Sequence, residues 1–219
     1  MKTNGMPASG TAFLTNRRPA LFVGLAGLSA FSGVLGIQAL LAFDHTPGAL
    51  GVVPTKWPAS STIERLSNRP ELLVFVHPQC SCSFATLTEL EKLSSRQRAG
   101  SAVPRITVLF YRPPNTEWAA TPLWNKAQEL PGARSMWDYG GREAARFGAL
   151  TSGYTILYSS AGDLLFHGGV TGSRGHAGDN YGMDDLRASL DSGLRARRPS
   201  QVFGCALQWN ASSEREVNR

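Results

Sequence analysis

The first feature of the hydrophobic pattern is an uncharged apolar run from Ala20 to Phe43, 24 residues long. A helix of that length crosses a bilayer, whereas the apolar core of a cleaved signal peptide is shorter, at about 7–15 residues. A buried core helix would show a polar face, and this run has none. The sequence therefore predicts an uncleaved anchor over residues 20–43 after a tail over 1–19, with late cleavage at the end of the run as the alternative.

Strand-length apolar runs and helically spaced segments follow the anchor. Residues 44–59 are rich in proline and glycine and predict a linker that lifts the next domain off the membrane. SSTIERLSN predicts a short helix with an N-cap serine before Pro70, and the apolar run ELLVFVH predicts a strand buried on both faces. SCSFATLTELEKLSSRQRAG has apolar residues at helical spacing and a stop at Gly100, and PRITVLFYR predicts a second buried strand.

The second half of the chain continues this alternation. Two short helical pieces, TPLWNKAQEL and GREAARFG, flank a candidate strand, ARSMWD. YTILYSS and DLLFHGGV predict a hairpin, and MDDLRASLDSGL predicts a closing helix. Strands that alternate with helices predict an α/β domain with a mixed sheet flanked by helices over residues 60–198, followed by a C-terminal tail over 199–219.

The net charge of +6 loses its significance for nucleic-acid binding once the charges are placed along the chain. Lys2, Arg17 and Arg18 precede the apolar run and no acidic residue does, which favours a cytoplasmic N-terminus. The densest later cluster, LRARRPS at 194–200, follows a helical segment and is typical of a solvated helix end. We therefore expect no nucleic-acid partner, and a single-pass protein of the cytoplasmic membrane whose C-terminal domain lies on the periplasmic or extracellular side. Cysteine pairs can cycle through disulfides in that compartment.

Two of the three cysteines, Cys80 and Cys82, lie one residue apart directly after an apolar strand, in VHPQCSCS. Unpaired backbone N–H groups and the helix dipole at a helix start favour a thiolate, so we expect Cys80 to be a nucleophile. A Cys80–Cys82 disulfide requires Cys80 to stay outside the helix, because residues i and i+2 of a helix point to different sides. Such a bond would be strained and easily reduced. A purely structural clip would stabilise little, because it closes so short a loop.

The cysteine turn and the order of elements resemble the thioredoxin-like superfamily over about residues 60–196. In that superfamily a buried strand runs into a turn with a Cys-x-x-Cys pair, where the next helix begins, and LLVFVHPQCSC places Cys80 at the attacking cysteine. YTILYSSAGDLLFHGGV resembles the hairpin after the family's cis-proline. HPQCSCS, FGALTSGYTILY, FHGGVTGSRGHAGDN and VFGCAL are similar to small membrane-anchored RedB-type proteins. The resemblance implies a thiol–disulfide oxidoreductase in which Cys80 attacks, Cys82 resolves, and the partners are thiol or disulfide proteins.

Two departures from the superfamily pattern affect the expected site. The cysteines form Cys-x-Cys rather than Cys-x-x-Cys, and Tyr154, after Gly153, stands where the cis-proline is expected. That proline helps to hold an extended substrate, so its loss implies a more open site with a tyrosine hydroxyl directed into it. The expected substrate-binding residues are neighbours of the cysteines in this scheme: His77, Pro78, Tyr154, Thr155, Arg174 and His176.

The glycine-rich segment GGVTGSRGHAGDNYG, residues 168–182, is too long for a tight connection. In a thioredoxin-like fold it would leave the sheet near the cis-proline loop, where Arg174 or His176 would hold a thiolate or an anionic substrate. A merely mobile loop is the alternative. Cys205, in VFGCAL, is expected to be a small buried residue, with a resolving thiol or a metal ligand as the alternative.

A metal-handling protein of the same fold is the second interpretation. Thiolates with one imidazole suit a soft ion such as copper(I). The candidate ligands are Cys80, Cys82, His176 and Cys205, with His77 or His167 as other sources of an imidazole. No cofactor is expected in the redox interpretation, and copper is expected in this one. A third interpretation is a non-catalytic tethered scaffold for an assembly partner.

Overall fold

The computed structural model describes residues 18–95, 103–113 and 121–207. The chain divides into two units, Met1–Phe43 and Asp44–Arg219, and each is described by itself. Helix α1, Arg18–Asp44, provides the described part of the first unit. Within α1, Leu21–Asp44 is long and apolar enough to cross a membrane, and none of this stretch is buried. A signal sequence meets the same criteria of length and composition.

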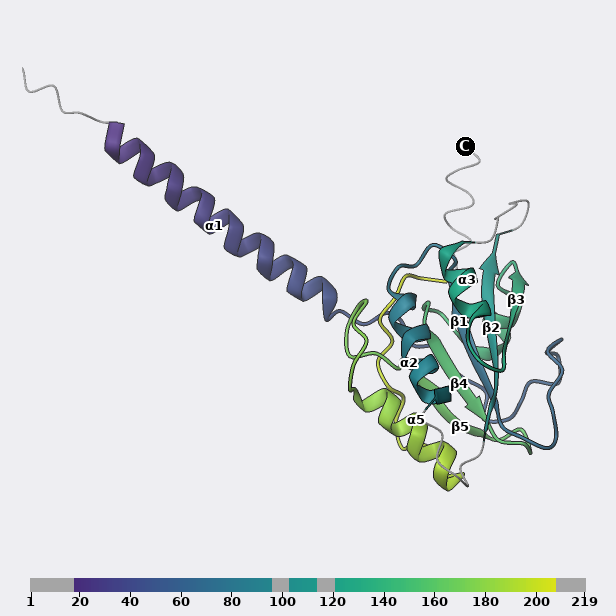
Figure 1. Cartoon of the computed structure of the whole chain (residues 1–219). Helices are drawn as coiled ribbons and strands as arrows, with labels where there is room; N and C mark the ends of the chain where they lie inside the picture. The colour runs from purple at the N-terminus through teal and green to yellow at the C-terminus, as the bar shows by residue number, and fades with distance from the viewer. Residues whose placement is uncertain (1–17, 96–102, 114–120, 208–219) are drawn as a thin grey trace, which may run out of the picture. The chain divides into compact units, whose positions relative to one another are not determined.

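The second unit is built on one mixed sheet of five strands in the order β3-β2-β1-β4-β5 (Figure 1). β1 pairs in parallel with β2 and antiparallel with β4, and it is therefore the central strand. β2 and β3 are parallel, whereas β4 and β5 form the antiparallel hairpin. The strands are β1 (Glu71–Val76), β2 (Arg105–Arg112), β3 (Ala133–Tyr139), β4 (Tyr154–Tyr158) and β5 (Leu164–Gly168).

Helices cover both faces of this sheet. Alternate residues of β1 point to opposite faces, so Leu72 and Val74 join one core while Leu73 and Phe75 join the other. The first core contains residues of α2 (Ser83–Ser95), α3 (Pro122–Gln128) and α5 (Tyr181–Ser192). The second contains residues of α4 (Arg142–Phe147). This arrangement confirms the predicted mixed sheet flanked by helices; Gly100, the expected stop after α2, lies outside the described residues.

The short helix predicted in SSTIERLSN is wrong, because residues 60–68 have no helical structure. The hydroxyls of Ser61 and Thr62 donate to the Glu143 carboxylate at 2.7 and 3.0 Å, so the expected N-cap serine bonds to α4 instead. Ile63 is buried in the second core. Contacts with distant residues therefore hold this segment in an irregular conformation.

Residues 44–59 also differ from the expected linker, since they pack against the domain. Val53 belongs to the second core, and the Trp57 ring lies 5.0 Å from the Phe147 ring. The backbone N–H of Gly48 donates to the Val202 carbonyl at 2.8 Å. Val202 itself is fully buried, so the start of the expected C-terminal tail also belongs to this packed unit.

Candidate thiol site

The Cys80 turn follows directly from the end of the central strand. The Cys80 N–H donates to the His77 carbonyl at 2.9 Å, and the Cys80 carbonyl accepts from the Ser83 N–H at 3.1 Å. Helix α2 begins at Ser83, so both Cys80 and Cys82 precede the regular helix. Cys80 thus lies in a tight turn between β1 and the start of α2, near the positive end of the helix dipole.

The Cys80 side chain is buried, with 1% of its residue surface exposed. The backbone N–H of Cys205 donates to its Sγ at 3.4 Å. Burial raises the pKa of the Cys80 thiol, but hydrogen bonds from the Cys205 backbone and from the Ser83, Cys205 and Ser152 side chains outweigh it. The net result is a lowered pKa, because donors around a sulfur stabilise its charged form.

Two buried serines that the sequence reasoning did not select hold this turn. The Ser152 and Ser83 hydroxyl oxygens lie 2.7 Å apart, and Ser152 Oγ also accepts from the His77 N–H at 2.7 Å. Gly153, the next residue, has a left-handed φ of 90°, and a Cβ there would lie 2.9 Å from Thr86 Oγ1. The only available sequence signal was position, since Ser152 and Gly153 directly precede the hairpin that follows the expected cis-proline.

Cys82 and Arg174 lie on the more open side of the site. Burial and the negative charge of Cys80 raise the pKa of Cys82, while the Arg174 guanidinium opposes this rise by its charge and a hydrogen bond. The guanidinium also donates to the carbonyls of Gly204 and Thr46, at 2.8 and 3.3 Å. Arg174 therefore connects the Cys82 side of the site to the segment that carries the third cysteine.

Cys205 is exposed, so the expectation that it is a small buried residue is wrong. Its carbonyl accepts from the Ser152 N–H at 2.7 Å, and the adjacent Ala206 forms a β-bridge with Thr151. Although the residue as a whole is exposed, partial burial of its thiol and the hydrogen bond to Cys80 raise the pKa of Cys205 to about 12. The structure thus brings all three thiols of the chain together, although Cys205 follows Cys80 by 125 residues.

The remaining expected site residues divide between the turn and the core. His77 begins the turn: its Nδ1 accepts from the Gln79 N–H at 3.2 Å, its ring stacks on Tyr111, and burial lowers its pKa.

Tyr154 is fully buried, and its hydroxyl lies 3.1 Å from His167 Nδ1. Burial raises the pKa of Tyr154 to about 12. Burial lowers the pKa of His167, and the positive charge of Arg195 lowers it further. The Tyr154 hydroxyl therefore belongs to the interior and not to an open site.

Two further expected residues have purely local contacts. Thr155 is fully buried, and its hydroxyl donates to the Gly153 carbonyl at 3.2 Å. His176 is exposed, and its Nδ1 lies 2.8 Å from the Arg174 carbonyl. The loop expected to carry two functional side chains thus places Arg174 beside the thiols, whereas the imidazole of His176 bonds to its own loop.

A mainly apolar groove of about 210 Å³ opens beside Cys80. Pro78 and the half-exposed Phe84 contribute from the turn and the start of α2, and Pro122 and Leu123 contribute from α3. Cys80 itself is among the lining residues, so the groove lies directly beside the buried cysteine.

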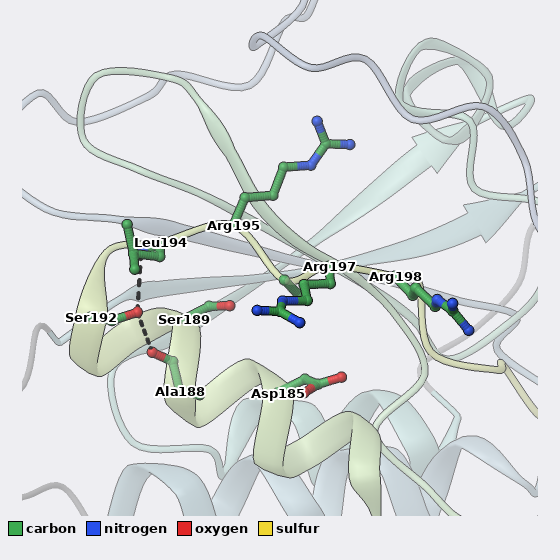
Figure 2. Close-up of a pocket in the computed structure, with 9 residues that line it drawn as sticks. Asp185, Ala188, Ser189, Ser192, Leu194, Arg195, Arg197 and Arg198 are labelled. Carbon is green, nitrogen blue, oxygen red and sulfur yellow. Dashed lines mark hydrogen bonds between the residues drawn. The ribbon is translucent and has the colours of Figure 1, made fainter.

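A second pocket lies at the end of α5 and shares no lining residue with this groove. Figure 2 shows Arg197 on the side of Asp185, while Arg195 extends away from the helix. The Ser192 hydroxyl donates to the Ala188 carbonyl at 2.7 Å and accepts from the Leu194 N–H at 3.1 Å, which closes the helix end. The arginines expected at a solvated helix end thus follow α5 and lie apart from the groove beside Cys80.

The candidate metal ligands do not form a metal-binding arrangement. In the described part of the chain, no three side chains of His, Cys, Asp or Glu are grouped so that they could hold a metal ion.

Similar proteins are found by comparison of structures and not by comparison of sequences. No family model matches the chain, and no curated protein matches it. An uncharacterised conserved protein of Geobacillus kaustophilus superposes with a TM-score of 0.53 at 14% identity, covering 76% of this chain and 94% of the other. A hypothetical protein of Sinorhizobium meliloti 1021 gives 0.51 at 18%, covering 76% and 96%. A thioredoxin-like superfamily protein covers 68% and 100% at 17% identity, but its TM-score of 0.39 is too low to carry an argument.

The topology itself decides the fold class. A buried central strand runs into the cysteine turn, the next helix begins there, and the chain returns through an antiparallel hairpin to a final helix. The fold is thioredoxin-like. Within this thioredoxin-like domain, Cys80 lies in the turn after the central strand, and Ser152, in the loop before β4, bonds to His77 and Ser83 on either side of Cys80.

Proposed function

We propose that this protein is a membrane-tethered thiol–disulfide oxidoreductase that acts outside the cytoplasmic membrane. The observation that carries the proposal is the environment of Cys80, a buried sulfur with a lowered pKa beside an apolar groove. The thiolate is the nucleophilic form of cysteine, and donors that stabilise it increase the fraction present near neutral pH. An apolar groove suits the residues that flank a disulfide in a protein substrate.

The proposed reaction begins with attack of the Cys80 thiolate on one sulfur of a substrate disulfide. A bond forms between Cys80 Sγ and that sulfur, and the other substrate sulfur leaves as a thiolate. A second protein thiol then attacks Cys80 Sγ, which releases the remaining substrate thiolate and leaves a disulfide in the protein. The substrate gains two electrons and the protein loses them. Two thiols are candidates for the second step: Cys82 of the Cys-x-Cys pair, and Cys205.

The decisive test isolates Cys80. In the Cys82→Ser/Cys205→Ser double variant, Cys80 is the only cysteine, and it should form a stable mixed disulfide when incubated with glutathione disulfide. A Cys80→Ser variant should not give the equivalent rapid adduct, and mass spectrometry measures both. Absence of an adduct on Cys80 would contradict the proposal, and stoichiometric copper(I) uptake by the reduced wild-type protein in that case would favour metal handling.

The location is proposed from Arg17 and Arg18 before the apolar helix, since positive charges favour the cytoplasmic side. A periplasm-dependent reporter fused after Arg219 should be active, and the mature protein should retain its first residues. Activity only of a cytoplasm-dependent reporter would contradict this topology, and a mature chain beginning near Asp44 would show cleavage instead of tethering.

A further inference from the structure

We propose that Cys205, and not Cys82, resolves the mixed disulfide on Cys80, so that the oxidised protein contains a Cys80–Cys205 disulfide. This inference rests on the proposed thiol–disulfide exchange, and it assigns the second thiol of that reaction. It makes the segment at residues 204–207 part of the catalytic site, although this segment lies beyond the last helix of the fold.

The chain holds Cys205 directly against Cys80. The Cys205 backbone nitrogen lies 3.4 Å from Cys80 Sγ. On one side, the Ser152 N–H bonds to the Cys205 carbonyl at 2.7 Å; on the other, the Leu207 N–H bonds to the Leu150 carbonyl at 2.9 Å. These bonds hold Cys205 against the loop that contains Ser152, and the Ser152 side chain also bonds to the Cys80 sulfur.

Gly204 explains why this segment approaches so closely. A Cβ at Gly204 would lie 2.0 Å from the Ser152 carbonyl oxygen, so only glycine permits the observed contact. The Arg174 guanidinium also donates to the Gly204 carbonyl at 2.8 Å. Two independent contacts thus fix the residue before Cys205, which holds the Cys205 backbone next to Cys80 Sγ.

Cys82 is less suited to close a disulfide with Cys80. The Phe84 N–H bonds to the Ser81 carbonyl at 3.2 Å and the Ala85 N–H to the Cys82 carbonyl at 3.2 Å, so the turn already winds toward α2. The Cys82 thiol also bonds to the Cys80 sulfur, but a disulfide between residues only two apart in this turn would be strained and easily reduced. A Cys80–Cys82 bond would need rearrangement of these backbone bonds, whereas Cys205 comes from a separate segment that faces Cys80.

The electrostatics give the two thiols a fixed order of reaction. In the reduced protein the Cys205 thiol is bonded to the Cys80 sulfur, and this bond together with burial keeps the Cys205 thiol protonated. Once Cys80 enters a mixed disulfide it no longer carries a charge, so its contribution to the raised pKa of Cys205 is removed, while that of burial remains. Arg174, whose charge lowers the pKa of Cys205, remains in place.

In the second step, Cys205 loses its proton to the substrate thiolate released in the first step or to water, and its sulfur attacks Cys80 Sγ. The Cys205–Cys80 bond forms, the bond between Cys80 and the substrate breaks, and the remaining substrate sulfur leaves with the electron pair.

Peptide mapping of the full-length protein in detergent tests this assignment. Cleavage after lysine and arginine leaves Cys80 and Cys82 on one peptide and Cys205 on another. After oxidation with glutathione disulfide, the expected product is a cross-linked pair of peptides joined through Cys80 and Cys205. A closed Cys80–Cys82 peptide without the cross-link would overturn the assignment.

Two matched variants provide a kinetic test. Cys205→Ser should retain glutathione on Cys80, with resolution slowed by at least about tenfold, whereas Cys82→Ser should release it and form the cross-link. The reverse pattern would overturn the role of Cys205 while leaving the proposed function intact. Failure of Cys80 to form any adduct, in these variants and in the Cys80-only protein, would instead refute the proposed function.

Discussion

At the residue scale, the Ser83 hydroxyl is predicted to help set the reactivity of Cys80. It is fully buried and hydrogen-bonded to the Cys80 sulfur, and it lowers the pKa of that thiol. A hydrogen bond to a charged group contributes about 1.5–3 kcal/mol. Ser83→Ala should therefore raise the Cys80 pKa.

The pH dependence of alkylation by iodoacetamide, in protein that lacks the other two cysteines, measures this shift. Because the folded-state pKa rises, the reactive thiolate should be lost at neutral pH and recovered only at higher pH. Ser94→Ala is the matched control, since Ser94 lies on the same helix and its hydroxyl donates to the Leu90 carbonyl. An unchanged profile for Ser83→Ala would show that the other donors, the backbone N–H of residue 205 and the Ser152 hydroxyl, set the pKa without Ser83.

Gly204 gives a second prediction at this scale. Gly204→Ala should displace the Cys205 segment, because the added methyl group meets the Ser152 carbonyl oxygen at 2.0 Å. Formation of the Cys80–Cys205 cross-link should slow by about fivefold or more, in line with a steric cost of about 1–3 kcal/mol. Gly172→Ala is the control, because a Cβ there is in ordinary contact with Asn180 at 3.8 Å. Equal cross-linking rates in the two variants would contradict the packing argument.

The candidate site could be predicted only in part from the sequence, because only some of its residues belong to periodic elements. Cys80 was accessible to sequence reasoning because it directly follows a strongly apolar strand and precedes a periodic helix. Cys205 lies outside any periodic element, and its contact with Cys80 spans 125 residues. Tyr154 was expected in an open site from its alignment with a proline, but its ring lies on the face of β4 that belongs to the second core.

At the element scale, a buried ion pair joins the starts of β1 and β2. Glu71 is fully buried, accepts from Arg105 Nε at 2.7 Å and accepts from the Thr107 hydroxyl at 2.8 Å. Glu71→Ala would leave the largely buried Arg105 charge without this carboxylate. Removal of one partner of a buried pair costs about 3–5 kcal/mol, so we expect a loss of that size in the free energy of unfolding.

Denaturant unfolding of the reduced protein measures the effect. Glu91→Ala is the matched control, because its ion pair with Lys126 is more exposed and should contribute only about 0–1 kcal/mol. Similar losses in the two variants would show that the buried pair does not contribute more than a surface pair. Glu71 lies at the start of β1, and the Cys80 turn follows the other end of this strand. Glu71→Ala should therefore leave the pKa of Cys80 unchanged in the folded protein.

The elements themselves were predictable where local periodicity decides the structure. The apolar runs of β1 and β2 and the helical spacing in α2 are complete within a few residues, and these elements formed where expected. The helix predicted in SSTIERLSN does not form, because the contact that decides its conformation, from Ser61 to Glu143, spans 82 residues. A serine near a possible helix start satisfies its hydroxyl equally well with a distant carboxylate, and the local pattern does not distinguish the two outcomes.

At the scale of the whole molecule, the segment after the apolar helix is part of the folded domain. The Leu164 N–H bonds to the Thr55 carbonyl at 2.9 Å, and the Tyr158 hydroxyl donates to the Pro54 carbonyl at 2.8 Å. The prolines and glycines of residues 44–59 predict a spacer. Here Gly51 serves a close approach instead, because a Cβ at this residue would lie 2.0 Å from the Gly148 carbonyl oxygen.

This packing predicts different stabilities for two truncated proteins. A protein of residues 44–219 should fold. A protein of residues 60–219 lacks Trp57, whose ring lies 5.0 Å from the Phe147 ring and 5.3 Å from the Tyr158 ring. Loss of a packed tryptophan alone costs about 3–5 kcal/mol. The shorter protein should therefore unfold at a clearly lower denaturant concentration, measured by circular dichroism with both proteins reduced. Coincident unfolding curves would show that residues 44–59 act as the spacer that their composition suggests.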